Sequence, residues 1–247
     1  MPFEIILITG TTAGLGLALL QHLYGCGAEI VCINRTRDQA IESLFPNVRF
    51  EMLDITDVER VHEWVKTFVP ADSRRILCIL NAAVNLTDND GCFNGARFSS
   101  VLRINLLGVT NFISAFESLV QGKSVIVTIG STAIWQVDPA HIGYHLSKLA
   151  VHRLHHALWR AGTRHSIKLV LAGPMMTRMA AQGGLQGIRR IAFRLLATPL
   201  DLVTYRLVQF ASSGRRMLVP SWKVAALRFS AGALDRVVGS VARLLRW

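Results

Sequence analysis

The sequence predicts a three-layer α/β/α domain built on a doubly wound parallel sheet. Short, almost uniformly apolar runs alternate with longer segments in which apolar residues recur at helical spacing. Strands that are apolar on both faces are typical of parallel sheets, because helices cover both sides of such sheets. The chain has 247 residues, of which 51% are hydrophobic, so it can bury a large core. We expect a single domain over residues 1–247.

Six apolar runs are predicted to be strands. Each is short, rich in Ile, Val, Leu or Cys, and bounded by polar or turn-forming residues. In order, they are Glu4–Thr9, Glu29–Asn34, Val48–Leu53, Ile76–Asn81, Ser124–Ile129 and Lys168–Ala172. The segments between them have apolar residues three and four positions apart, which predicts helices. These helices are Leu15–Tyr24, Asp38–Leu44, Asp57–Phe68, Phe98–Val120 and Gly143–Ala161.

A glycine-rich turn follows the first predicted strand and leads directly into a helix. It reads Thr9-Gly10-Thr11-Thr12-Ala13-Gly14-Leu15-Gly16. Glycines at this junction let the backbone approach a pyrophosphate, and the helix N-terminus supplies free N–H groups and a partial positive charge. An ordinary tight turn is the alternative. The position at the first strand–helix junction favours a nucleotide site that includes Gly10, Thr12, Gly14, Leu15 and Gly16.

The second predicted strand ends in Ile33-Asn34-Arg35. Sites that select NAD usually place an acidic residue here for the ribose hydroxyls, whereas an Arg accommodates the 2′-phosphate of NADP. Arg35, with Arg37 as a helper, therefore favours NADP(H), and NAD(H) remains the alternative. A solvated basic loop is the non-functional interpretation.

Ser131, Tyr144 and Lys148 indicate proton-transfer chemistry on a carbonyl or alcohol group. Lys148 lies four residues after Tyr144, so the two share one helix face, and the ammonium can lower the pKa of the phenol. A Ser at the end of a nearby strand can hold a substrate oxygen against that phenol. A Tyr and a Lys at this spacing also occur by chance, so the surrounding motifs decide the interpretation.

Those motifs, taken together, resemble the short-chain dehydrogenases/reductases, a family of single-domain Rossmann-type enzymes of about this length. The resemblance runs from Ile5 to about Thr177. It comprises the glycine loop, Asp54-Ile55 after the third strand, Asn81-Ala82-Ala83 after the fourth, Asn105, Ser131, Tyr144 and Lys148 as a tetrad, and Ala172-Gly173-Pro174-Met175-Met176-Thr177. Ala83 replaces a usual Gly and Ala172 a usual Pro, but neither change removes a chemical group.

The resemblance implies a role for each matched residue. Asn105, Ser131, Tyr144 and Lys148 would be catalytic, with Asn105 holding a water that links Lys148 to solvent. Lys148 would also contact the nicotinamide ribose. The implied cofactor-binding residues are Gly10, Thr12, Gly14, Leu15, Gly16, Asn34, Arg35, Asp54, Ile55, Asn81, Ala82, Ala83, Tyr144, Lys148, Pro174, Met175 and Thr177. Family members commonly pair their two long helices across a dimer axis, so a homodimer or homotetramer is expected.

We expect an NADPH-dependent reductase of a ketone or other carbonyl, with Tyr144 as the proton donor and Ser131 bonded to the substrate oxygen. Trp135 and His141 lie between those two residues in sequence and are expected to border the substrate, with loop packing as the alternative. An alcohol dehydrogenase acting in the oxidative direction and a cofactor-sensing regulator without catalysis are the competing functions. The unsubstituted tetrad argues against the regulator.

The net charge of +11 is concentrated near the C-terminus, where residues 186–247 hold 11 Lys and Arg but only two acids. In family members the segment after the position of Thr177 forms the substrate lid. The resemblance therefore implies a cofactor-binding and catalytic core over residues 1–185, followed by a substrate lid and C-terminal segment over residues 186–247. Its basic residues oppose apolar ones on a helical projection, which is typical of an interfacial helix on anionic lipid. A docking face for an acidic carrier or phosphate-bearing substrate, and a solvated face on a core-packed helix, are the alternatives. The membrane contact and the docking face both favour a hydrophobic, lipid-like substrate.

Other classes of site are disfavoured by composition. Cys26, Cys32, Cys78 and Cys92 lack metal-ligand spacing and are expected to be free thiols, as in a reducing compartment. His152 and His156 share a helix face but lack an evident third ligand, so no metal is expected. The basic segment lacks a nucleic-acid reader motif. With no export signal or spanning segment visible, a cytoplasmic protein is expected, with a peripheral membrane contact as the further option.

Overall fold

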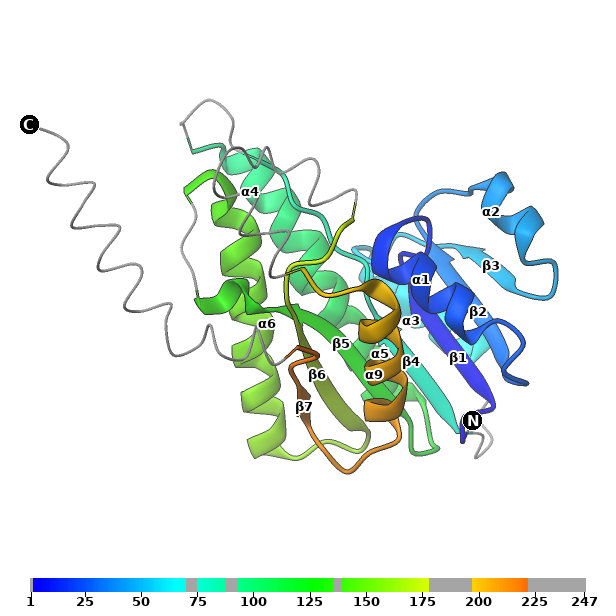
Figure 1. Ribbon diagram of the computed structural model, residues 1–247. Coiled ribbons are helices and arrows are strands. Elements are labelled where there is room, and N and C mark those ends of the chain that lie inside the picture. Colours follow the sequence, from blue (N-terminus) through cyan, green and yellow to red (C-terminus); the bar gives the residue numbers. More distant parts are fainter. Residues whose placement is uncertain (1, 70–74, 88–92, 136–138, 178–196, 222–247) are drawn as a thin grey trace, which may run out of the picture.

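Seven strands form one all-parallel sheet in the order β3-β2-β1-β4-β5-β6-β7 (Figure 1). The computed structural model describes residues 2–69, 75–87, 93–135, 139–177 and 197–221. Within them the strands are β1 (Ile5–Thr9), β2 (Glu29–Asn34), β3 (Arg49–Met52), β4 (Ile76–Leu80), β5 (Val125–Ser131), β6 (Ser166–Ala172) and β7 (Met217–Leu218). The predicted doubly wound α/β class is therefore confirmed.

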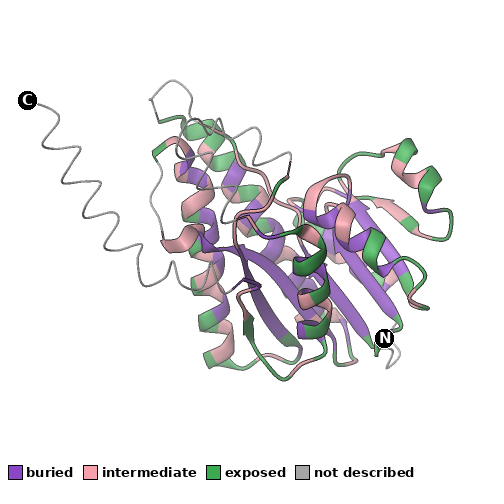
Figure 2. Cartoon of the chain, viewed as in Figure 1, coloured by how far each residue is buried: buried purple, intermediate pink, exposed green. Residues whose placement is uncertain are grey.

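Helices cover both faces of the sheet, as the apolar strands require. They are α1 (Gly14–Leu23), α2 (Gln39–Leu44), α3 (Val58–Phe68), α4 (Gly95–Leu102), α5 (Gly108–Leu119), α6 (Ile142–Ala161) and α9 (Leu200–Ala211). Alternate residues of a strand point to opposite faces: in β1, Ile6 and Ile8 pack with α1 and α9, whereas Ile5 and Leu7 pack with α3 and α5. The buried residues consequently gather in the strands and on the inner faces of the helices (Figure 2).

The order of the strands fixes where a ligand site can form. The chain runs outward from β1 to β3, then returns to β4 on the other side of β1. Loops that leave the carboxyl ends of β1 and β4 therefore diverge, and ligands of open α/β sheets bind in the crevice at this switch point. The glycine loop follows β1, and Asn81 follows β4.

The predicted helix Phe98–Val120 differs from the observed structure. Helical backbone begins at Gly95, where the Asn94 side chain accepts a hydrogen bond from the Arg97 amide. A π-helical segment, η1 (Arg103–Leu107), then separates α4 from α5. Such insertions are rare and frequently occur at functional sites. The apolar spacing of this stretch does not reveal the π turn, because it stays compatible with helix throughout.

Lys168 is a cation in the otherwise apolar strand β6, and its contacts with α9 explain its position. Its buried ammonium donates hydrogen bonds to the carbonyls of Phe210 and Ala211, both at 3.0 Å, and to that of Ser213. These carbonyls lie at or just beyond the C-terminus of α9, where the helix dipole favours positive charge. Lys168 thus joins β6 to α9, an element that the sequence analysis did not predict.

Lys168→Met is expected to reduce the free energy of unfolding by about 1–3 kcal/mol, because the carbonyls of Phe210, Ala211 and Ser213 lose the hydrogen bonds from the Lys168 ammonium. Chemical denaturation followed by circular dichroism measures this change. Lys123→Met removes an exposed ammonium and serves as the control, with an expected change within about 0.5 kcal/mol. Equal effects of the two substitutions would contradict the assigned role of Lys168.

The cysteines and the basic C-terminal segment are the other features predicted from the sequence. Cys26, Cys32 and Cys78 are free thiols, as predicted, and Cys92 lies outside the described residues. Of the basic segment 186–247, only residues 197–221 are described, so the predicted interfacial helix at the C-terminus remains a prediction. In the described part of the chain, no helix combines the length and apolarity needed to cross a membrane.

Candidate functional site

A cleft of about 350 Å³ opens at the carboxyl ends of β1 and β4, where the strand order predicts a ligand site. Most of the predicted cofactor residues line it together with three of the four predicted catalytic residues. The predicted residues that line it are Gly10, Thr12, Gly14, Leu15, Asn34, Arg35, Asp54, Ile55, Asn81, Ala82, Ala83, Ser131, Tyr144, Lys148, Met175 and Thr177. The volume falls in the usual range for small-molecule sites, roughly 300–1,000 Å³.

The glycine loop is held at one side of this cleft by Asn81. The Asn81 amide donates to the carbonyls of Thr9 and Gly10 at 3.1 and 2.9 Å. Gly10 has a φ of +73°, which disfavours side chains, and a Cβ on Gly16 would lie 1.9 Å from the Gly10 oxygen. Gly16 is therefore required for packing beneath the loop and does not itself line the cleft.

The N-terminus of α1 faces the cleft without a side-chain cap. Its N-cap residue is Ala13, and no acidic residue lies in the first turn. By contrast, Asp38, Asp57 and Asn94 cap the N-termini of α2, α3 and α4 through their side chains. Uncapped N–H groups at a helix start, beside a loop that only glycine can form, fit an anionic group such as a pyrophosphate.

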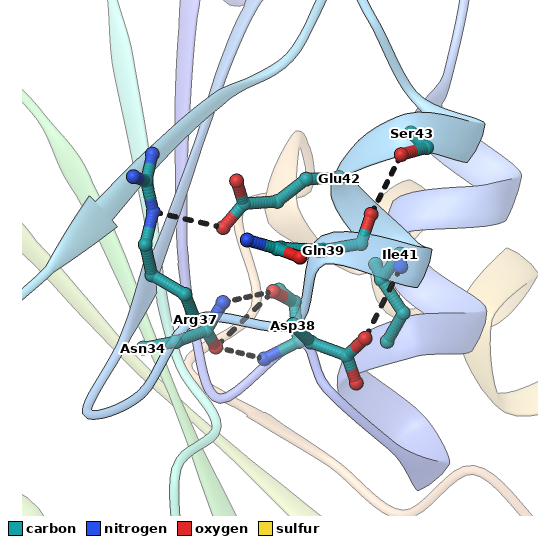
Figure 3. A network of polar contacts seen from close by, with 8 residues as sticks. Asn34, Arg37, Asp38, Gln39, Ile41, Glu42 and Ser43 are labelled. Carbon is teal, nitrogen blue, oxygen red and sulfur yellow. Dashed lines mark hydrogen bonds and ion pairs between the residues drawn. The ribbon is translucent and has the colours of Figure 1, made fainter.

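Asn34 ties the end of β2 to the glycine loop. Its amide oxygen accepts a 2.7 Å hydrogen bond from the Thr11 backbone, and its Nδ2 donates to the Thr11 hydroxyl at 2.9 Å. Arg35, the next residue, is exposed and lines the cleft. Arg37 does not line it: its Nε lies 3.3 Å from Glu42 in the ion pair shown in Figure 3. Of the two predicted cations, the structure thus places only Arg35 at the site.

Asp54 lies at the same end of the cleft as an ionised group. Partial burial alone would raise the pKa of Asp54, but hydrogen bonds from Thr56 and the charges of Arg35 and Arg103 lower it below the usual value. The neighbouring Ile55 carbonyl accepts a 2.9 Å hydrogen bond from Asn111 of α5. The cleft therefore offers a carboxylate and a guanidinium within one small region.

Ser131, Tyr144 and Lys148 meet at the other end of the cleft. Ser131 ends β5, and its side chain hydrogen-bonds to that of Tyr144 on α6. The Ser131 oxygen also accepts a 3.1 Å hydrogen bond from the Ala133 amide, which fixes its orientation. The Lys148 ammonium lies 5.7 Å from the centre of the Tyr144 ring and donates to the Ile129 carbonyl at 2.8 Å.

The electrostatics of this trio differ from the sequence-based expectation. Burial raises the pKa of Tyr144, and the hydrogen bond from Ser131 only partly opposes this shift. Burial also lowers the pKa of Lys148 to about 8. The sequence-based expectation that Lys148 lowers the pKa of the phenol is therefore not met, because desolvation disfavours the charged form of both groups. At neutral pH the phenol keeps its proton.

Five predicted site residues lie away from the cleft lining. Asn105 is buried in the π-helical segment and bonds to Val84 and Ser147. Trp135 packs against the apolar cluster of α6 and β6, and His141 is buried at the start of α6. For Trp135 this is the loop-packing alternative. The last two are Gly16, beneath the loop, and Pro174, whose carbonyl accepts from the Thr198 amide.

The cleft also includes residues that the sequence analysis did not predict as site residues. Ala13, Ile33, Ala172 and Gly173 belong to the quoted motifs, whereas Thr36, Leu53, Val84, Ile104, Ile129 and Gly130 do not. Most adjoin a predicted residue or end a strand, so their positions follow from the parallel-sheet pattern. Ile104 had no such signal; it lies in the π-helical segment η1, which the sequence analysis did not predict.

Comparisons with known proteins identify the family of this chain. The model of the family described as short chain dehydrogenase matches residues 4–186. An uncharacterized oxidoreductase of Thermotoga maritima is 25% identical over 179 residues, which are 69% of this chain and 70% of the relative.

Solved structures share the fold at lower identity. A short chain dehydrogenase from Burkholderia cenocepacia, in complex with NADP, covers 97% of this chain and 98% of its own at 18% identity and a TM-score of 0.72. A putative NAD(P) dependent gluconate 5-dehydrogenase from Beutenbergia cavernae, with bound NADP, covers 90% and 97% at 20% identity and a TM-score of 0.76. The match of a family model to most of the chain, on a fold and cleft of this kind, places the protein in the short chain dehydrogenase family.

Proposed function

We propose that the protein is an NADP(H)-dependent oxidoreductase that reduces a carbonyl group on a hydrophobic substrate, with Tyr144 as the proton donor. The observation that carries the proposal is the hydrogen bond between Ser131 and Tyr144 beside the buried Lys148, at one end of a cleft whose side wall is an uncapped helix N-terminus. Family membership supports the oxidoreductase class.

The cleft fits a dinucleotide along its length. The glycine loop and the N-terminus of α1 would hold the pyrophosphate, Asp54 and Ile55 would contact the adenine, and Arg35 would contact the 2′-phosphate. When bound, the nicotinamide supplies the hydride. The NADP reported for the Burkholderia and Beutenbergia structures supports the same choice of cofactor here.

The protonation state of Tyr144 is compatible with its role as the proton donor in reduction. A phenol whose pKa is raised above 10 holds its proton at neutral pH, so it can donate that proton to a substrate oxygen. Oxidation would instead need the phenolate as a base. Ser131, fixed by the Ala133 amide, would hydrogen-bond to the same substrate oxygen. Lys148 would orient the cofactor ribose.

Apolar lining supports a hydrophobic substrate. Val84, Ile104 and Met175 line the cleft together with the Ser131–Tyr144 pair. The basic, apolar segment 186–247 supports the same substrate class through a membrane surface or an acidic carrier. Leu107, Leu146 and Leu149 are exposed on η1 and α6, and they support a homodimer or homotetramer.

Arg35→Ala is expected to weaken NADPH binding by about 10- to 100-fold, because a charge-assisted hydrogen bond to a phosphate contributes roughly 1.5–3 kcal/mol. NADH binding should change by less than about threefold, since NADH lacks the 2′-phosphate. Fluorescence titration with both nucleotides measures the ratio.

Arg37→Ala is the matched control for the loss of one positive charge. Arg37 pairs with Glu42 outside the cleft, so a much smaller change in NADPH affinity is expected. If Arg35→Ala weakens NADH and NADPH equally, Arg35 does not select the 2′-phosphate.

A further inference from the structure

Ser147, between Tyr144 and Lys148 in sequence, is fully buried on α6 and has no role in the proposed chemistry so far. Its hydroxyl donates a 2.7 Å hydrogen bond to the Tyr144 carbonyl, one turn earlier in the helix. Its oxygen also accepts a 3.0 Å hydrogen bond from Nδ2 of Asn105, which belongs to the π-helical segment η1. Ser147 therefore joins two separate elements of the fold.

Asn105 continues this connection to the wall of the cleft. Its Oδ1 accepts a 2.8 Å hydrogen bond from the Val84 amide, and its Nδ2 donates to the Val84 carbonyl at 2.9 Å. A side-chain amide has two N–H donors, so Val84 and Ser147 together use both of them. Val84 lines the cleft. A continuous network thus runs from the cleft wall through Asn105 to α6.

The contact with the Tyr144 carbonyl is not by itself informative. Ser and Thr side chains within helices commonly donate to a carbonyl of the preceding turn. Ser118 does so in α5, where its hydroxyl donates to the Ser114 carbonyl at 2.7 Å while it remains exposed. Ser147 differs because it is fully buried and its oxygen also accepts a hydrogen bond from Asn105.

The location of the network gives it a functional consequence. Tyr144 and Lys148 lie within one turn of Ser147, and Tyr144 must meet Ser131 of β5 across the cleft. A small shift of α6 would lengthen the bond between Ser131 and Tyr144. Misplacement of reacting groups by a fraction of a bond length to about 1 Å is costly for catalysis.

We propose that Ser147 is a positioning residue for the reduction: through Asn105 it holds the first turns of α6, and with them Tyr144 and Lys148, in register with the cleft wall at Val84. This inference rests on the proposed function. Asn105 is then a positioning residue as well, in addition to any contact it makes with water.

Ser147→Ala tests the proposal in the full-length protein, with NADPH and the ketone that the wild type reduces fastest. We expect kcat per NADPH-binding site to fall about tenfold, the effect of one lost buried hydrogen bond. The dissociation constant of NADPH should change by less than about twofold, since the glycine loop and Arg35 belong to other elements and the hydrogen bonds of Ser147 do not involve them. Ser118→Ala, which removes only a local helix bond, should leave both values unchanged.

Two further measurements separate positioning from mere structural support. The single variant Asn105→Ala and the double variant Asn105→Ala/Ser147→Ala should have the same kcat. Asn105→Ala already breaks the network, so the second substitution should add no further loss. Ser147→Cys retains a side chain of similar shape, but sulfur is a weak hydrogen-bond acceptor. This variant should therefore also lower kcat, and it provides the test if Ser147→Ala folds poorly.

The outcomes distinguish this inference from the proposed function. An unchanged kcat per binding site in Ser147→Ala or Ser147→Cys, or additive losses in the double variant, would overturn the role of Ser147 alone. A wild-type protein that binds NADPH but reduces no ketone would overturn the proposed function, and the role of Ser147 with it.

Discussion

Replacing Tyr144 by Phe is expected to lower kcat by about 10³-fold while NADPH binds nearly as in the wild type. The substitution removes only the hydroxyl, which Ser131 contacts and which would donate the proton. General acid catalysis contributes roughly 10²–10⁴-fold in enzymes, so its loss sets the size of the effect. Turnover is measured as NADPH oxidation across a set of aliphatic and aromatic ketones, and binding by fluorescence titration.

Tyr205→Phe provides the matched control for this substitution. Tyr205 is exposed on α9 and does not line the cleft, so removal of its hydroxyl should change neither turnover nor binding. A Tyr144→Phe variant that retains more than about a tenth of the wild-type kcat would contradict the assignment, since a required proton donor contributes at least about 10²-fold.

Gly16→Ala is expected to displace the glycine loop and so to lower both folding stability and NADPH affinity. The added Cβ would lie 1.9 Å from the Gly10 oxygen and 2.6 Å from Asn81 Nδ2, so the loop must move and its bond to Asn81 must lengthen. Overpacking of this kind costs about 1–3 kcal/mol of folding stability. We also expect NADPH affinity to fall by at least about tenfold, because the loop and the N-terminus of α1 no longer present their N–H groups together.

Gly95→Ala is the control, since Gly95 begins α4 with open space where a Cβ would be. Alanine has a higher helix propensity than glycine, so the melting temperature should stay the same or rise slightly. Thermal unfolding and NADPH titration on both variants measure the comparison. A Gly16→Ala protein with wild-type melting temperature and affinity would show that the close packing beneath the loop is not required.

The sequence was sufficient to predict the core of the fold because its determinants are local. Uniformly apolar runs such as Ile5–Thr9 predict strands covered on both faces, and the structure has one there with all five residues buried. The π turn around Asn105 was not predictable, since its backbone hydrogen bonds shift by one residue without changing the apolar spacing. Strand β7 and helix α9 were also missed. β7 has only two residues, and the contacts of Lys168 in β6 with the end of α9 span more than 40 residues of sequence.

Sequence motifs also predicted most of the residues that line the cleft. Motifs at the ends of neighbouring strands meet in one cleft because parallel strands end at one edge of the sheet, which brings Gly10, Asn81 and Ser131 together. Interactions between distant residues were not visible in the sequence. The ion pair that holds Arg37 away from the cleft and the burial that raises the pKa of Tyr144 both depend on the folded structure.

Transfer of deuterium to a ketone, from NADPH that carries deuterium at both positions of nicotinamide C4, tests directly whether the protein is a reductase. We expect the wild-type protein to place the label on the carbinol carbon of the alcohol product, and Tyr144→Phe to transfer almost none. Binding of NADPH without transfer of label to any ketone of the set would contradict an enzymatic role and favour a protein that only senses the cofactor.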